Sequence, residues 1–129
     1  MHTKLNYKDK IMNENEIEEE IQAKNLNAPR LTPDIIDSLI KEKSFYRLTD
    51  VLTVCVLTLQ NTFTVTGESA CASPANYNQK IGEDIAFTNA RDKIWPLEGY
   101  LLKQKLYEES LWHKIDYTMN IYVDYQRKK

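Results

Sequence analysis

Glycine is scarce in this chain, which has three glycines, four prolines, two cysteines and two histidines among 129 residues. Three glycines do not supply a phosphate loop or a dinucleotide fingerprint. His2 and His113 lie far apart in the sequence, and no CxxC or HxxxH spacing occurs, so neither a metal site nor a cofactor is predicted. Two cysteines are too few for a disulfide scaffold, and we interpret Cys55 and Cys71 as small buried apolar groups.

A long apolar run and a strong net charge are also absent. No stretch approaches the ~20 apolar residues that span a bilayer, and the polar N-terminus is unlike a signal peptide, so no membrane partner is expected. The formal net charge of −2 provides no positive field to attract nucleic acid. A length of 129 residues allows one domain with a genuine core.

The most informative feature present is a nearly uncharged stretch from Val51 to Gln79, in a chain that is 28% charged. Glu68 is the only charged residue in this stretch. Two runs with strand-like composition, LTVCVLTL and FTVTG, lie within it and predict an antiparallel hairpin. An isolated hairpin is marginal in water, so helices are expected to pack on it.

The register of this hairpin follows from its apolar residues. A three-residue loop, Gln60–Thr62, gives one wholly apolar face, whereas a two-residue loop mixes the faces. The expected pairs are Leu59 with Phe63, Leu57 with Val65, and Cys55 with Gly67. The last position of such a loop favours glycine in the left-handed region, so Thr62 is a local misfit.

Three helical segments are expected around the hairpin. The first covers residues 16–26 and carries one thin apolar stripe. The second starts with Thr32 as N-cap and Pro33 in the first turn, and is expected to reach Phe45 and Tyr46. Both are short packing helices on the N-terminal side of the hairpin.

The third segment is expected to start at Ser73 and Pro74, with an apolar face that includes Tyr77, Ile81 and Ile85. Pro96 removes a backbone donor, which predicts a kink or break near Asp92–Trp95. The amphipathic pattern continues towards residue 112 and offers an interface for a homo-oligomer. The fold class is therefore α+β, with an antiparallel β-hairpin packed against a long kinked C-terminal helix and two short N-terminal helices.

The organisation follows from these segments. Residues 1–15 are interpreted as a disordered tail or an extension, and residues 16–112 as a single α+β domain. Residues 113–129 form a C-terminal extension whose structure is either an added strand or an extra helical turn.

Small side chains fill the loop from Gly67 to Ser73, apart from Glu68. One interpretation is that they let the hairpin pack tightly against the following helix. The other is that they let an anionic ligand approach the free N–H groups at the start of that helix. The candidate ligand-binding residues here are Glu68, Ser69, Ser73 and Asn76.

A second candidate site lies in the segment NARDKIWPLEGY. Arg91 and Trp95 are four positions apart, so the guanidinium can lie over the indole. A polar and aromatic pocket able to stack a base and hold a phosphate would consist of Asn89, Arg91, Trp95, Glu98 and Tyr100. The alternative for Trp95 is a core anchor beside the proline kink.

Three long segments of the chain are distinctive, namely EIEEEIQAKNLNAPRLTPDIID, LTVCVLTLQNTFTVTGESACASPANYNQKIGEDIA and NARDKIWPLEGYLLKQKL. They are similar to a small family of tailed-phage and prophage proteins, named after gene product forty-nine of one phage and gene sixty-six of another. The resemblance covers about residues 16–107. It departs at Thr62, where glycine is expected. The resemblance implies a phage-encoded accessory protein of the host bacterial cytoplasm and assigns no catalytic residue.

Two classes of function follow. The first is a non-enzymatic binding module for host takeover or immune evasion, which sequesters a small nucleotide signal or a host protein. The second is a small nucleotide-processing enzyme that uses Glu68 or Asp92 as general base. Incubation with cyclic and linear nucleotides distinguishes the two, because only the enzyme consumes its ligand.

Overall fold

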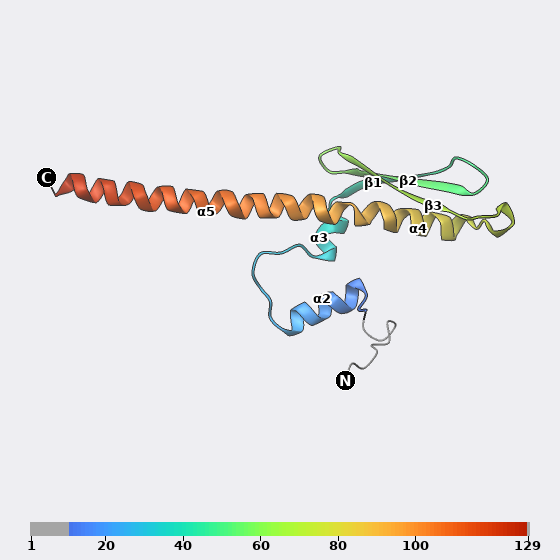
Figure 1. Ribbon diagram of the computed structural model, residues 1–129, viewed down its shortest axis with the longest axis horizontal. Coiled ribbons are helices and arrows are strands. Elements are labelled where there is room, and N and C mark those ends of the chain that lie inside the picture. The colour runs from blue at the N-terminus through green and yellow to red at the C-terminus, as the bar shows by residue number, and fades with distance from the viewer. Residues whose placement is uncertain (1–10, 129) are drawn as a thin grey trace, which may run out of the picture.

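A three-stranded antiparallel sheet lies along one side of two consecutive helices in the computed structural model, which describes residues 11–128 (Figure 1). The elements in chain order are α2 (Glu14–Ala23), α3 (Pro33–Ser38), β1 (Ile40–Arg47), β2 (Leu52–Leu59), β3 (Thr64–Ala70), the 3-10 turn η1 (Pro74–Asn76), α4 (Gln79–Asp92) and α5 (Ile94–Arg127). The predicted α+β class is confirmed. The part of the predicted tail that covers residues 1–10, and residue 129, lie outside the described residues.

The β2–β3 hairpin has the predicted register. Leu57 pairs with Val65 and Cys55 with Gly67, and the Leu59 N–H donates to the Phe63 carbonyl at 2.8 Å. Thr62 has φ of 71°, in the left-handed region expected for this position. The Thr62 N–H donates to the Leu59 carbonyl at 2.9 Å, which helps to hold the turn closed.

Strand β1 was not predicted. Thr32 caps α3 as expected, since its side chain accepts a hydrogen bond from the Ile35 N–H, but the helix ends at Ser38 rather than near Tyr46. Residues 40–47 instead pair with β2, and Phe45 lies opposite Cys55. Without β1, the outer N–H and C=O groups of β2 would have no partners, so sheet pairing overrides the weak helical pattern of this segment.

Helix α4 packs unusually close to the sheet. Its buried residues Gly82, Ala86 and Ala90 recur every four positions. A Cβ atom at Gly67 of β3 would lie only 2.2 Å from the Ala86 carbonyl oxygen and the Ala90 nitrogen. The packing interpretation of the small side chains therefore holds at Gly67.

Two predictions about this helix were wrong. The chain forms η1 after Ser73, and α4 starts later, with the Asn78 side chain accepting a hydrogen bond from the Ile81 N–H at 3.0 Å. Ile81 and Ile85 are also exposed rather than packed on the sheet. A close approach to the backbone of β3 accepts only small side chains, so the helix turns its glycine and alanines inward instead.

The predicted break near Pro96 is present, because α4 ends at Asp92 and α5 begins at Ile94. Pro96 lies in the first turn of α5, where a missing N–H is tolerated. Helix α5 then runs to Arg127 and projects beyond the sheet (Figure 1). The extension is thus helical rather than a strand, and every residue from Tyr107 to Lys128 is exposed.

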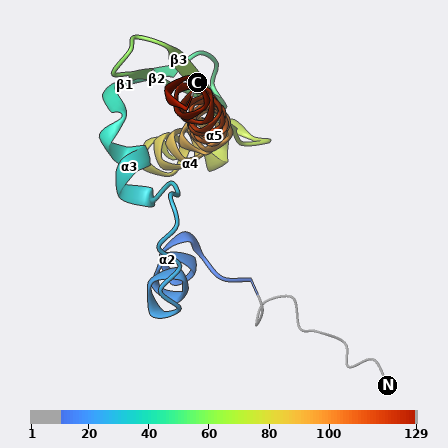
Figure 2. The same ribbon diagram turned by 90° about the vertical axis from the view of Figure 1, so that its left-hand side faces the viewer.

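Helix α2 stands apart from this body, on the side of α4 and α5 that faces away from the sheet (Figure 2). None of its residues is buried. Arg30 holds it through hydrogen bonds of 2.7 and 2.8 Å to the Glu18 carboxylate.

Candidate functional site

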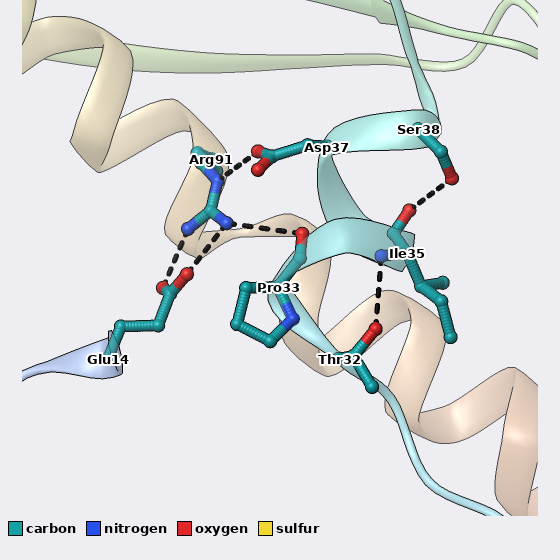
Figure 3. A network of polar contacts seen from close by, with 7 residues as sticks. All are labelled: Glu14, Thr32, Pro33, Ile35, Asp37, Ser38 and Arg91. Atoms are coloured by element: carbon teal, nitrogen blue, oxygen red, sulfur yellow. Dashed lines mark hydrogen bonds and ion pairs between the residues drawn. The ribbon is translucent and has the colours of Figure 1, made fainter. Parts of the chain in front are cut away.

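Arg91 is fully engaged in holding the N-terminal segments together. Its guanidinium forms two hydrogen bonds with the Glu14 carboxylate, at 2.7 and 2.8 Å, and a third with Asp37 at 2.7 Å (Figure 3). The Pro33 carbonyl accepts a longer contact at 3.4 Å. These partners, Glu14 first, raise the pKa of Arg91 above its ordinary value. This arginine therefore joins α4, α3 and α2.

Trp95 lies beneath α2 rather than beneath the guanidinium. It is half-buried and packs against the core. It also lines a cleft of about 360 Å³, together with Ile17, Ile21 and Leu31. The pairing of Arg91 with Trp95 that the spacing suggested is replaced by contacts of both residues with the N-terminal segments.

The other candidate ligand-binding residues near Arg91 and Trp95 in the sequence lie in different parts of the structure. The Asn89 side chain donates to the Glu68 backbone carbonyl at 2.8 Å, so it ties α4 to β3. Glu68 itself is exposed, and no ion pair involves it within residues 11–128. Glu98 and Tyr100 line a groove of about 360 Å³ between α5 and the tip of the β2–β3 hairpin.

The small-residue loop opens on a cavity at the other end of the sheet. Ser69 and Asn76 both line this cavity of about 100 Å³, so the structure brings these two predicted residues together. Ser73 stands beside it, and its backbone carbonyl accepts hydrogen bonds from the Asn76 N–H at 3.0 Å and the Cys71 thiol at 3.3 Å. The Ser73 hydroxyl makes no capping hydrogen bond.

A row of three polar residues crosses the sheet at this end. Arg47 of β1 lies opposite Thr53 of β2, which lies opposite Ser69 of β3. Residues directly opposite in antiparallel strands share a face, so the row continues the face that α4 covers. It is the polar end of an otherwise apolar core surface.

Thr53 is the unusual member of the row. The residue is only 2% exposed, and its Oγ1 has no hydrogen-bond partner among the described residues. A Cβ atom on Gly82 would lie only 3.0 Å from this oxygen, so the backbone of α4 at Gly82 packs closely against the hydroxyl. A buried hydroxyl without a partner is costly, and such groups are rare in folded proteins.

Arg47 is positioned by two contacts. Its guanidinium carbon lies 3.6 Å from the centroid of the Tyr77 ring, and its Nη2 donates to the Asp50 carbonyl at 2.8 Å. Arg47 and Tyr77 both line a second cavity, of about 220 Å³. Its walls consist of Phe45, Tyr46, Arg47, Thr53, Tyr77, Gln79 and Glu83. Because both cavities share Thr53 and Tyr77, we call them together the Thr53 site.

The electrostatics of the Thr53 site favour an anion on one side and a hydrogen-bond donor on the other. Arg47 and the N-terminus of α4 supply positive charge and a positive dipole end. The Glu83 carboxylate accepts a hydrogen bond from Gln79 at 3.1 Å and has further acceptor capacity. Within residues 11–128, no group of three or more metal-binding side chains is present.

Sequence reasoning found Ser69 and Asn76 but missed Arg47, Thr53 and Tyr77. The hairpin register contained a signal for Thr53, because two positions beyond the Cys55–Gly67 pair it predicts a Thr53–Ser69 pair on the same buried face. Arg47 carried no comparable signal, since its strand was interpreted as the end of a helix.

The comparisons with known proteins agree with the resemblance. The model of the Phage protein (N4 Gp49/phage Sf6 gene 66) family matches residues 31–106. The chain belongs to this family. In this phage protein the matched region includes the sheet, α4 and the Thr53 site, and it ends within α5. A search of the curated proteins and a search of the solved structures found no match. Among the described residues, no helix is both long and apolar enough to cross a bilayer.

Proposed function

We propose that this phage protein is a non-enzymatic binding module that sequesters a small nucleotide in the host cytoplasm, and that the Thr53 site holds the ligand. The buried Thr53 hydroxyl carries the proposal. A buried hydroxyl without a hydrogen bond costs about 1–3 kcal/mol. A polar ligand atom that bonds to it removes this cost. Withdrawal of a signalling nucleotide would serve host takeover or immune evasion.

Arg47 supports the phosphate end of the ligand. The Tyr77 ring and the Asp50 carbonyl hold the guanidinium in place but occupy only one of its N–H donors. A guanidinium fixed in this way loses little entropy when its remaining donors bind two phosphate oxygens. The N-terminus of α4 adds a favourable dipole on the same side.

The opposite wall suits the sugar and the base. Glu83 offers a carboxylate that accepts hydrogen bonds from a ribose hydroxyl or an exocyclic amine. Phe45 provides aromatic surface against which a base stacks. A ligand with a phosphate, a hydroxylated sugar and a planar ring meets all three requirements.

The alternative of a nucleotide-processing enzyme finds little support at this site. Glu68 pairs with Val54, so it lies on the sheet face away from α4, whereas Thr53 and Ser69 share the covered face. Asp92 is the last residue of α4, about 15 Å along the helix from Gly82, which lies beside Thr53. Neither proposed base lies on the walls of the two cavities.

The proposal is tested by measuring the melting temperature with AMP, ATP, cyclic AMP and cyclic dinucleotides. A ligand at a hundredfold excess over its Kd stabilises the fold by about 2.7 kcal/mol, which is a rise of several degrees. The nucleotide recovered after denaturation should be unchanged. Arg47→Gln should abolish the rise, and Lys103→Gln on the exposed face of α5 serves as the matched control.

Two results would contradict this function. Conversion of the nucleotide would identify an enzyme. The absence of any rise at millimolar concentrations of every nucleotide would leave a host protein as the partner.

A further inference from the structure

The larger cavity of the Thr53 site carries two opposite charges that do not pair with each other. Arg47 and Glu83 both line its walls, yet no ion pair joins them within residues 11–128. The Arg47 guanidinium lies on the Tyr77 ring instead. Glu83 is half-buried, and Gln79 donates to one of its two carboxylate oxygens. The cavity therefore presents a cation on one wall and a carboxylate with acceptor capacity to spare on another.

The direction of the two elements that form these walls follows from two ring contacts. Arg47, the last residue of β1, contacts Tyr77 just before α4 begins. Lys43, earlier in β1, has its Nζ 5.3 Å from the centroid of the Phe87 ring, further along α4. Strand β1 and helix α4 therefore run antiparallel along the cavity.

This arrangement sets the spacing of the polar groups. Glu83 is one turn, about 6 Å, along α4 from its first residue, Gln79. Phe45 is two residues, about 7 Å, along β1 from Arg47. Because Phe45 and Glu83 line the same cavity, they lie on opposite walls at a similar distance from the cation.

A nucleotide places its groups in a matching order. The ribose carries the 5′-phosphate and stands between the phosphate and the base. With the phosphate on Arg47, the ribose hydroxyls are therefore the donors that lie one step away, beside Glu83. An exocyclic amine of the base would have to reach back past the ribose to the same carboxylate. Hydroxyl groups that donate to a carboxylate form strong, charge-assisted hydrogen bonds.

We propose that Glu83 binds the 2′,3′-diol of the ribose, so that the Thr53 site selects ribonucleotides over deoxyribonucleotides. This inference rests on the proposed function and specifies its ligand. A deoxynucleotide leaves part of the half-buried carboxylate without a partner, and sites built to bind a hydroxyl reject analogues that lack it. A phage protein with this preference withdraws a ribonucleotide and leaves the precursors of DNA in solution.

Isothermal titration calorimetry of the full chain with AMP, 2′-deoxy-AMP and IMP tests the preference. The deoxy analogue should bind about tenfold or more weakly than AMP. IMP lacks the exocyclic amine but keeps the diol, so it should bind as tightly as AMP. Equal affinities for AMP and 2′-deoxy-AMP would overturn the inference and leave the proposed function standing.

Glu83→Gln tests whether this carboxylate is responsible. The affinity for AMP should fall about tenfold while that for 2′-deoxy-AMP changes little, so the preference disappears. Asp84→Asn is the matched control, because the neighbouring carboxylate pairs with Lys80 at 2.7 Å and lines neither cavity. This control should keep the preference.

Two further results are decisive. A Glu83→Gln variant that still prefers AMP would overturn the role of Glu83. If another nucleotide raises the melting temperature but none of these three binds, the diol contact is wrong and the binding module remains. No response to any nucleotide would overturn the proposed function and this inference together.

Discussion

The guanidinium of Arg47 stacks on the ring of Tyr77 at 3.6 Å. Arg47 belongs to the edge strand β1, and Tyr77 precedes α4, so the contact joins the sheet to the start of the helix that covers it. Thr53 lies beside both residues, on the wall that they share. The contact thus fixes a cation next to the buried hydroxyl on which the proposed function depends.

Thr53→Val should have opposite effects on folding stability and on ligand binding. Valine has nearly the shape of threonine, so the variant removes the unpaired hydroxyl without leaving a cavity. The free energy of unfolding without ligand should rise by about 1 kcal/mol, while nucleotide affinity falls about tenfold or more. Urea denaturation and isothermal titration calorimetry measure the two effects. A destabilised variant would mean that the hydroxyl has a partner within the protein.

Gly67→Ala should disrupt the packing of α4 on β3. The new methyl group would lie 2.2 Å from two backbone atoms of α4, so the helix has to move. We expect a loss of about 3 kcal/mol or more in the free energy of unfolding. Gly99→Ala is the matched control, because nothing lies within 4 Å of its added Cβ. That control should stabilise α5 by about 0.5–1 kcal/mol. Equal effects at the two glycines would contradict the close approach.

Arg91→Met should release α2 without affecting the Thr53 site. The substitution leaves Glu14 and Asp37 without their shared cation and should cost about 1–3 kcal/mol in chemical denaturation. Nucleotide binding should be unchanged, which distinguishes this arginine from Arg47. Lys24→Met removes only an exposed pair with Glu20 and should leave the free energy of unfolding nearly unchanged. If Arg91→Met abolished nucleotide binding, the ligand site would have to lie in the segment around Trp95 instead.

The attachment of α2 should depend on pH through Glu18. The hydrogen bond from Arg30 lowers the pKa of Glu18 to about 2, below its ordinary value of 4.5. A lowered pKa means that the pair stabilises the folded state fully above about pH 4.5 and loses this contribution as the pH falls towards 2. Trp95 fluorescence in a Trp112→Phe background reports the attachment, since Trp95 lies beneath α2.

Arg30→Gln provides the control for this titration. In that variant Glu18 should titrate near its ordinary pKa, so the change in Trp95 fluorescence between pH 4.5 and 2 should largely disappear. An identical acid transition in both proteins would show that another group controls the attachment of α2.

The hairpin could be predicted because residues close together in the sequence determine its register. The apolar residues of β2 and β3 admit only one register with a consistent buried face, and the break before Pro96 follows from a missing backbone donor. The alternating four and three spacing also indicated that α5 would be helical beyond the sheet domain, although the poor alternation after Ile115 concealed how far.

Strand β1 and the face of α4 could not be predicted, because both depend on tertiary contacts. Residues 40–47 become a strand through pairing with the open edge of β2. Helix α4 turns Gly82 and Ala86 inward because Gly67 lies directly beneath it, and a hydrophobicity pattern gives more weight to Ile81 and Ile85. Arg47 enters the candidate site only through these two long-range arrangements.

The most direct test of the account is a ¹⁵N NMR titration of the full chain with the nucleotide that gives the largest rise in melting temperature. The account predicts that the amide signals of Arg47, Thr53, Ser69 and Tyr77 shift together with a single Kd, while those of α5 beyond Tyr107 stay unchanged. Shifts confined to the groove around Phe63 and Leu101, or around Trp95, would contradict it.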